Sequence, residues 1–262
     1  MERVKIFQVD AFTSKLFKGN SAAVCPLNNW LDDKMMQSIA MENNLSETSF
    51  FMIKENKYYI RWFTPKTEID LAGHPTLAAA HVIFTEMGKE KNYIEFHTKK
   101  GDLLTVSLKN NIFSMNFPSH TVVQDNSKLD EISYALRSKA SKFFLGKYGM
   151  AIYESEKEII NILPDFEALN ALDLDGIIVT APGENSDFVS RFFAPKFGIL
   201  EDPVTGSAHC DLIPFWSNVL KKKYMLARQI SERGGELKCT HLGDRVIIGG
   251  EAITYMKGEL FL

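Results

Sequence analysis

Arg61–Lys66, with the sequence Arg-Trp-Phe-Thr-Pro-Lys, is repeated with small changes at Arg191–Lys196, Arg-Phe-Phe-Ala-Pro-Lys. The second copy begins 130 residues after the first (191 minus 61), which is about half of the 262-residue chain. Each copy leads into a loop with a polar residue directly before proline, at His74 and at Asp202. A repeat of this length exceeds the units of solenoid proteins. We therefore interpret the chain as two homologous halves, each ending in a loop and a helix N-terminus.

The composition is typical of a soluble globular protein, with 45% hydrophobic and 24% charged residues. A net charge of −3 gives no electrostatic reason to expect a nucleic acid or a membrane surface as a partner. The N-terminus is charged at Glu2, Arg3 and Lys5, where a signal peptide would be apolar, and no apolar run approaches the length of a membrane span. We expect a cytoplasmic protein that binds neither nucleic acid nor membrane.

The sequence gives no sign of a metal or a cofactor. The cysteines, Cys25, Cys210 and Cys239, are too scattered for a zinc site or a disulfide framework. The six histidines form no His-Glu-x-x-His pattern, and the glycine-rich signatures of nucleotide and dinucleotide binding are missing. We expect chemistry that needs neither a metal nor a cofactor.

Hydrophobic patterning predicts two apolar helices among many short strands. One helix is expected over residues 75–87 and the other over about 206–220, where Pro214 should bend it. A first strand is expected to begin at residue 3. Further strands are expected over residues 21–25, 48–53, 58–64, 93–98, 103–108, 112–117, 149–154, 176–180, 188–194, 224–230 and 245–249. A further helix is expected from residue 33 to about residue 43.

These elements predict an α+β fold of two pseudo-symmetric lobes, each a β-sheet wrapped around a central buried helix. The lobes are expected at residues 1–118 and 119–262, with the crossing at Pro118–His120. The apolar end of the chain, from residue 252, is a candidate for a strand that returns to the first lobe.

The two loops are suited to binding an anion. With Pro75 at the first helical position, His74 would be the N-cap and the nearby backbone N–H groups would point outward. In the second loop, Gly206 lets the backbone approach a ligand and Ser207 adds a hydroxyl. If the lobes face each other, a carboxylate-bearing substrate would lie between two helix N-termini.

Each of these polar residues also has a structural interpretation. Asp202 alone is more simply a helix cap, and Glu47, at the mouth of the expected 48–64 hairpin, is more simply a solvated carboxylate. His74 is an indifferent cap, so its structural and functional interpretations balance. For Arg61 and Arg191 we favour ion pairs within each repeat.

Taken together, the motifs resemble one family, the PhzF-like phenazine-biosynthesis proteins, which share the fold of diaminopimelate epimerase. The resemblance runs along nearly the whole chain, and Ser21, where the family usually has proline, is a small departure. The matching segments are Phe7–Phe12, Gly19–Val24, Ser46–Thr48, Arg61–Pro65, Leu71–Thr76, Glu201–His209, Ala227–Gln229 and Arg233–Gly235.

The resemblance implies an isomerase without metal or cofactor that moves a proton on a small carboxylate-bearing substrate. Glu47 would be the general acid/base, with Asp202 and His74 assisting. Substrate-binding positions would be Gly73, Thr205, Gly206 and Ser207. A homodimer is also expected, since homodimers are common in the family.

Two other functions stay open at the level of sequence. The first is an amino-acid epimerase or racemase; the two-thiol form is disfavoured, because Gly73 and Thr205 stand where the epimerases have cysteine. The second is a metabolite-binding protein that turns nothing over. The substrate itself, and the choice between allylic isomerisation and epimerisation, are not specified by these residues.

Overall fold

The computed structural model describes residues 3–88 and 92–262, which form two compact units. Unit 1 holds the described chain up to Asn116 together with Gly249–Leu262, and unit 2 is Phe117–Ile248. A simple division after residue 118 would place the end of the chain in the second lobe. It belongs to unit 1 instead, because the last strand pairs antiparallel with the first from Arg3↔Phe261 to Ala11↔Ala252.

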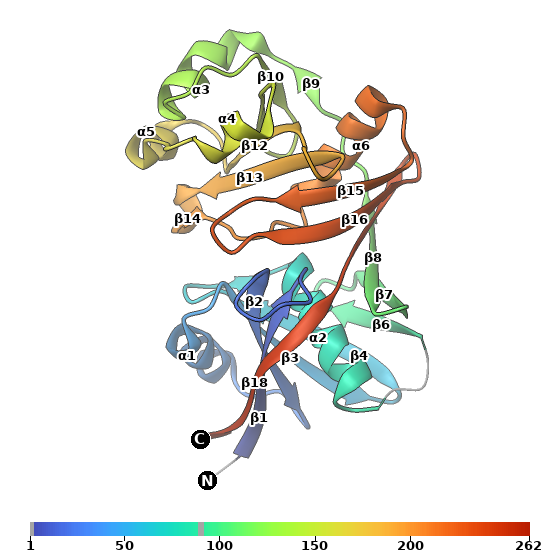
Figure 1. The fold of residues 1–262 in the computed structure, drawn as a ribbon. Coiled ribbons are helices and arrows are strands. Elements are labelled where there is room, and N and C mark those ends of the chain that lie inside the picture. Colours follow the sequence, from blue (N-terminus) through green and yellow to red (C-terminus); the bar gives the residue numbers. More distant parts are fainter. Residues whose placement is uncertain (1–2, 89–91) are drawn as a thin grey trace. The chain divides into compact units, whose positions relative to one another are not determined.

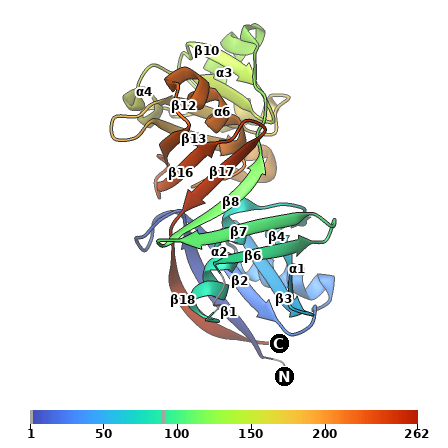
Figure 2. The ribbon, with the colours of Figure 1, turned by 90° about the vertical axis from the view of Figure 1, so that its right-hand side faces the viewer.

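Unit 1 is built mainly from strands, with one helix on each side of them (Figures 1 and 2). Its elements are β1 (Arg3–Ala11), β2 (Asn20–Leu27), α1 (Asp33–Asn43), β3 (Glu47–Lys54), β4 (Lys57–Phe63), β5 (Glu68–Ile69), α2 (Gly73–Thr85), β6 (Tyr93–Thr98), β7 (Leu103–Lys109), most of β8 (Ile112–Pro118) and β18 (Ala252–Phe261).

Unit 2 is also built mainly from strands, several of them shorter than those of unit 1, and it contains additional short helices. Its elements are β9 (Val123–Gln124), α3 (Leu129–Ala135), β10 (Lys142–Leu145), β11 (Gly149–Ile152), α4 (Glu156–Ile160), α5 (Phe166–Ala171), β12 (Ile177–Pro182), β13 (Phe188–Ala194), β14 (Ile199–Glu201), α6 (His209–Leu220), β15 (Tyr224–Gln229), β16 (Gly235–His241) and most of β17 (Arg245–Gly250), with 3₁₀ turns at Asn126–Lys128 and Pro195–Phe197.

The two units repeat the same strand pairings. In unit 1, β1–β2 is antiparallel, β2–β3 parallel, β3–β4 antiparallel, β4–β6 parallel and β6–β7 antiparallel. In unit 2, β10–β11, β11–β12, β12–β13, β13–β15 and β15–β16 follow with the same alternation. Helices α2 and α6 occupy equivalent places in this order, each inside the connection that joins a parallel pair. The expected two homologous halves are therefore present as two copies of one topology.

Helix α2 is buried around nearly its whole circumference, as its apolar sequence predicts. Leu77, Ala78, Ala79 and Ala80 have no exposed surface, and the helix packs against β1, β2, β3 and β18. The alanines let the strands approach closely, since a larger side chain would fill that space. Figure 1 shows α2 in teal among the strands of unit 1. The central helix expected from the sequence is thus confirmed for this unit.

A second layer of helices covers the other face of each sheet. In unit 1, Met36 and Ile39 of α1 pack with Phe50 and Phe63, whose rings meet edge to face at 5.5 Å. In unit 2, short helices α3, α4 and α5 cover a larger cluster that includes Phe143 and Phe193. The sequence did not predict these three helices, or β10 and β16.

The repeated arginines form matching ion pairs, as the structural interpretation of the motif predicts. Arg61 donates to both carboxylate oxygens of Glu68 at 2.7 and 2.9 Å. Arg191 does the same with Glu201 at 2.8 and 2.9 Å, and also donates to the carbonyls of Ile159 and Ile162. Each pair ties β4 or β13 to the short strand that leads into the functional loop. The motif is therefore scaffold.

We predict that Arg191→Met lowers the free energy of unfolding by about 2–4 kcal/mol, because it removes the donor of the partly buried Glu201 carboxylate and of the Ile162 carbonyl. Arg137→Met is the matched control in the same unit. Arg137 is well exposed in its 2.6 Å pair with Asp165, and removing an exposed pair changes stability by about 1 kcal/mol or less. Urea unfolding measures both. Equal losses in the two variants would contradict the structural role of Arg191.

Candidate active site

Helix α2 begins earlier than the sequence indicated. Its N-cap is Ala72, which makes no side-chain cap bond, so the expectation that His74 is the N-cap is wrong. The reason is that no N–H of the first helical turn has an acceptor within the helix, so proline is tolerated at the third position as well as the first. Gly73 and His74 therefore lie in the first turn, and the histidine side chain extends from the helix itself.

Glu47 and His74 meet inside unit 1. Oε2 of Glu47 lies 3.0 Å from Nε2 of His74, and the two side chains are only 12% and 7% exposed. Their mutual orientation does not satisfy the angles of a hydrogen bond, so the contact is a close approach of carboxylate and imidazole. Glu47 is thus not the solvated loop carboxylate of the structural alternative. A base and a second proton carrier in contact are suited to proton transfer.

Strand register shows why only one half carries this carboxylate. Thr48 pairs with Phe63 in unit 1, and Ile177 pairs with Phe193 at the equivalent place in unit 2. The residue before Thr48 is Glu47, whereas the residue before Ile177 is Gly176. A Cβ added to Gly176 would lie 2.5 Å from the ring of Phe192. A side chain at this position of the second half would have to displace the ring of Phe192.

In unit 2, α6 begins at His209. The sequence predicted a start at about Gly206, three residues earlier. Gly206, Ser207 and Ala208 instead form a tight turn, in which the N–H of His209 donates to the carbonyl of Gly206 at 3.0 Å. Such i→i+3 bonds are common where helices begin. The N-cap is Ala208, so Asp202 does not cap this helix and its structural interpretation is wrong.

Asp202 is held by a network within its own loop. Oγ1 of Thr205 donates to Oδ2 of Asp202 at 2.6 Å. Gln229, at the end of β15, accepts from the N–H of Thr205 at 2.8 Å and donates to the carbonyl of Asp202 at 2.7 Å. The groups of Thr205 are thus committed to the loop, which favours a supporting role over the substrate contact expected from the sequence. The sequence did not single out Gln229, although this residue lies in one of the segments that match the family.

Two further residues support the turn. The hydroxyls of Ser207 and Tyr148 lie 3.1 Å apart, and Tyr148 comes from the loop between β10 and β11. His209 is fully buried, and its Nδ1 lies 2.8 Å from the carbonyl of Thr205. Burial lowers the pKa of His209 to about 4, more than the Thr205 carbonyl raises it. A neutral ring then donates Nδ1–H to that carbonyl and fixes the tautomer.

The candidate residues therefore form two sets, one in each unit. Glu47, Gly73 and His74 are the N-terminal set, and Asp202, Thr205, Gly206 and Ser207 are the C-terminal set. Each set combines a carboxylate with a chain segment at or just before the start of a long helix. Backbone N–H groups at such a place attract negative charge.

The cysteines are unsuited to nucleophilic or acid–base work. Cys25, Cys210 and Cys239 are all buried and unbridged. Burial raises the pKa of Cys210 to about 12 and also raises the pKa values of Cys25 and Cys239. Within residues 3–88 and 92–262, no three His, Cys, Asp or Glu side chains cluster as a metal site would need. In the same ranges, no helix combines the length and apolar character needed to cross a membrane.

Comparison with known proteins gives the family. The model of the family described as phenazine biosynthesis-like protein, PhzC-PhzF, matches residues 9–258. A Pseudomonas aeruginosa protein named as an uncharacterized isomerase is 44% identical over 262 residues, which cover 99% of both chains. The crystal structure of a PhzF family protein from Enterococcus faecalis superimposes with a TM-score of 0.95 at 44% identity, covering 100% of both chains.

This chain is a member of the PhzF family, as the motifs indicated. A hydroxyproline epimerase from Agrobacterium vitis has a TM-score of 0.65 at 10% identity, with 98% of this chain and 92% of that one covered. At that identity the likeness shows the fold alone. The expected class, a lobed α+β fold of the diaminopimelate epimerase type, is confirmed by these structural neighbours.

We predict that His209 makes the protein acid-labile. Its pKa is about 4 in the folded chain and about 6.5 when unfolded. Protons therefore bind the unfolded chain first as the pH falls from 6.5 towards 4, and stability is lost over that window. The loss from this residue should reach about 2 kcal/mol between pH 7 and pH 5.

The measurement is urea unfolding at pH 7, 6 and 5 on the native protein and on His209→Asn. Asparagine retains a donor but does not titrate in this range, so the variant should lose about 1–2 kcal/mol less than the native protein over the same interval. If both proteins show the same pH dependence, His209 is not held neutral in the fold.

Proposed function

We propose that this protein is a cofactor-independent isomerase that moves a proton on a small carboxylate-bearing substrate, with Glu47 as general acid/base. The observation that carries the proposal is the 3.0 Å contact between the largely buried Glu47 carboxylate and the His74 imidazole. Family membership supports it, because relatives from Pseudomonas aeruginosa that are 42% and 44% identical over 98–99% of this chain are named as isomerases.

Glu47 takes a proton from a carbon whose electron pair can delocalise, and the resulting anion is protonated at another carbon. One C–H bond breaks and another forms, so the step needs no oxidant, reductant or second substrate. His74 lies beside the carboxylate and can hold or relay the proton in transit.

Negative charge on the substrate is stabilised by backbone N–H groups near the helix starts. In α2 these belong to the first turn, at Gly73 and His74. In unit 2 they belong to the turn of Gly206 and Ser207 before α6. Such donors are fixed before the reaction and need no reorganisation as charge develops. We propose that the N-terminal and C-terminal sets contact the same substrate.

Asp202 serves as the second carboxylate in this scheme. Its Oδ2 accepts from Thr205 and its backbone is held by Gln229, so its position is fixed independently of the substrate. Ser207 is an additional hydroxyl donor beside the turn. In this scheme the two units differ chemically although they share a topology.

A two-thiol racemase is not supported by the cysteines. A thiol whose pKa is about 12, as at Cys210, remains protonated near neutral pH and is a poor base. An epimerase that uses Glu47 with another base differs from the proposed isomerase only in which carbon receives the proton. Incorporation of solvent deuterium separates an isomerase or an epimerase from a protein that binds the substrate without turnover.

We predict that the protein catalyses incorporation of solvent deuterium into suitable small carboxylic acids and that Glu47→Gln reduces the rate at least about 10²-fold, the size typical of losing a positioned acid/base. Mass spectrometry measures deuterium content, and NMR locates the labelled carbon. Glu42→Gln is the matched control, because Glu42 is an exposed carboxylate in the same unit; it should retain the native rate.

Four outcomes separate the alternatives. A double bond that shifts with the label indicates isomerisation, whereas label without a shift at a stereocentre indicates epimerisation. Unchanged exchange in Glu47→Gln removes that residue from its role. Binding of the acids without exchange in the native protein would falsify the enzymatic proposal.

The homodimer expected from the family resemblance stays a prediction. Light scattering on the purified full chain would give its mass directly. A mass equal to one 29.7 kDa chain over the working concentration range would contradict it.

A further inference from the structure

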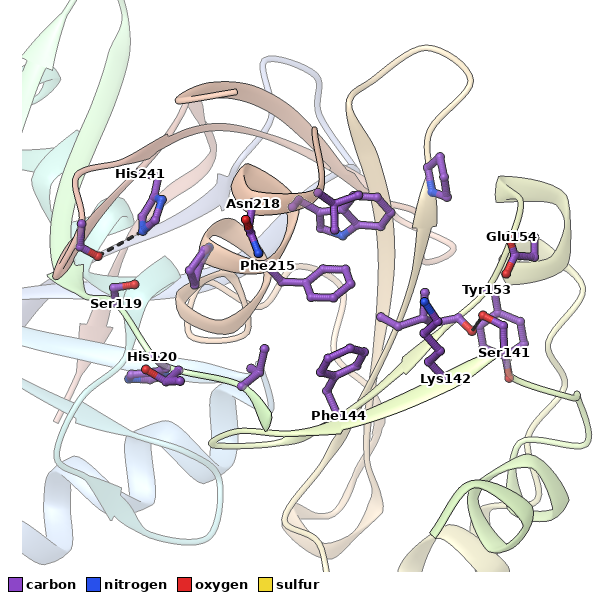
Figure 3. Close-up of a pocket in the computed structure, with 18 residues that line it drawn as sticks. Ser119, His120, Ser141, Lys142, Phe144, Tyr153, Glu154, Phe215, Asn218 and His241 are labelled. Atoms are coloured by element: carbon purple, nitrogen blue, oxygen red, sulfur yellow. Dashed lines mark hydrogen bonds between the residues drawn. The ribbon is translucent and has the colours of Figure 1, made fainter. Parts of the chain in front are cut away.

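A pocket in unit 2 is separate from both candidate sets. Its volume is about 650 Å³, within the range of small-molecule sites. It is lined by the 119–122 segment, by residues of β10 and the end of β11, by α6 and by the end of β16 (Figure 3). Neither Asp202 nor any residue from 202 to 207 lines it. The proposed isomerase chemistry makes no use of this pocket.

Three aromatic side chains form the middle of the pocket. Phe144 of β10 and Phe215 of α6 meet edge to face, with ring centroids 5.1 Å apart. Trp216 lies 5.3 Å from Phe215 at an interplanar angle of 87°. The indole N–H donates to Thr180 at 2.9 Å and the side chain is buried, so Trp216 supports Phe215 and offers no free polar group. Such walls favour a flat aromatic ligand, which can add another offset or edge-to-face contact.

Tyr153 and His241, two further polar residues of the lining, already have hydrogen-bond partners within the protein. The hydroxyl of Tyr153 donates to the carbonyl of Ser138 at 3.1 Å. Both ring nitrogens of His241 are engaged, with Ser217 and with the carbonyl of Gly243, each at 3.0 Å. These residues shape the pocket but do not select a polar group on a ligand.

His120 is a polar residue of the lining whose side chain and backbone are both held by hydrogen bonds. Its Nδ1 lies 2.7 Å from Oδ1 of the fully buried Asp211. Its backbone N–H donates to the carbonyl of Cys210 at 3.0 Å. That carbonyl is the one that Pro214, four residues later and without an N–H, leaves without its helical partner. His120 is thus fixed at two points, and its Nε2 points away from Asp211.

Asp211 is difficult to explain as a stabilising residue. Burial raises its pKa, although His120 and the N–H of Tyr148 both favour the charged form. A buried pair of this kind adds little to stability compared with apolar side chains of the same size. A buried carboxylate that orients an imidazole at the edge of a pocket is, in contrast, common where ligands bind.

Lys142 provides the positive charge. Its Nζ takes part in no hydrogen bond or ion pair in the part of the chain that the structure describes. In Figure 3, Phe144 and Phe215 lie between His120 on one side and Lys142 on the other. The acidic residue of the lining, Glu154, lies beyond Lys142 in the same view. A ligand that spans the pocket from His120 to Lys142 would therefore place its ring against Phe144 and Phe215.

We propose that this pocket is a second binding site, for an aromatic carboxylate that carries a hydroxyl on the opposite side of its ring. The carboxylate pairs with Lys142, the ring packs against Phe144 and Phe215, and the hydroxyl bonds to Nε2 of His120. Because no residue of the two candidate sets takes part, the site is independent of the proposed isomerase activity.

The test is a calorimetric titration of the full chain with 4-hydroxybenzoate, with 4-hydroxybenzamide as the uncharged comparison. We expect saturable binding of the acid and at least about tenfold weaker binding of the amide, which corresponds to loss of one charge-assisted contact. Lys142→Ala should weaken binding of the acid by the same factor. Lys139→Ala, which removes an exposed lysine of the same unit outside the pocket, should leave it unchanged.

Two more variants locate the probe. Phe144→Ala should weaken binding at least about fivefold, and Glu47→Gln should leave the affinity unchanged because Glu47 is not part of this pocket. If binding of 4-hydroxybenzoate does not saturate at probe concentrations up to about 10 mM, the proposal is overturned. Equal affinities of Lys142→Ala and Lys139→Ala, or loss of binding in Glu47→Gln, overturn it as well.

Discussion

Two parallel strand pairs determine how this protein is built. Strands β4 and β6 run parallel in unit 1, as do β13 and β15 in unit 2. A parallel pair cannot be joined by a tight turn, so the chain must return along the sheet before the second strand begins. Helices α2 and α6 make that return. The segment between each first strand and its helix becomes a loop at a helix start, where backbone N–H groups are available to an anion.

The repeated ion pairs make that arrangement rigid. Glu68 and Glu201 lie on the short strands that follow β4 and β13, and the repeated arginines bind both oxygens of each carboxylate. A planar guanidinium fits a carboxylate in one orientation, so it fixes direction as well as distance. The loops that follow are then free to differ. One carries His74 and the other Asp202, and unit 1 carries Glu47 at the place where unit 2 has Gly176.

The sequence predicted those helices, strands and turns whose residue pattern is local and long enough to recognise. The apolar stretch within residues 75–87 is recognisable as a buried helix, and the turn at Glu55 and Asn56, both with positive φ, is recognisable from its polar residues. Helices α4 and α5 have good caps, Ser155 and Asp165, but five and six residues are too few for a helical period to emerge. Strand β16 did alternate, with Leu237 and Cys239 buried, yet its charged neighbours obscured the pattern.

The sequence named candidate site residues but not the contacts between them. Glu47 and His74 lie 27 residues apart (74 minus 47) on different elements, and only the packing of α2 against β3 brings them together. The N-cap of α2 was misplaced because proline fits any position of a first turn. Gln229 could not be found from local sequence, since its function in the loop comes from hydrogen bonds to residues 24 and 27 positions away.

The pairing of β1 with β18 also has a consequence for biosynthesis. Unit 2 is one continuous segment, Phe117–Ile248, whereas unit 1 needs both ends of the chain. During translation, unit 2 has all of its residues before unit 1 does, although unit 1 is synthesised first. Until β18 emerges, one edge of β1 stays unpaired, and exposed strand edges promote association between chains. The nascent protein is therefore most vulnerable to aggregation in its earliest-made half, and completion of the last strand ends that interval.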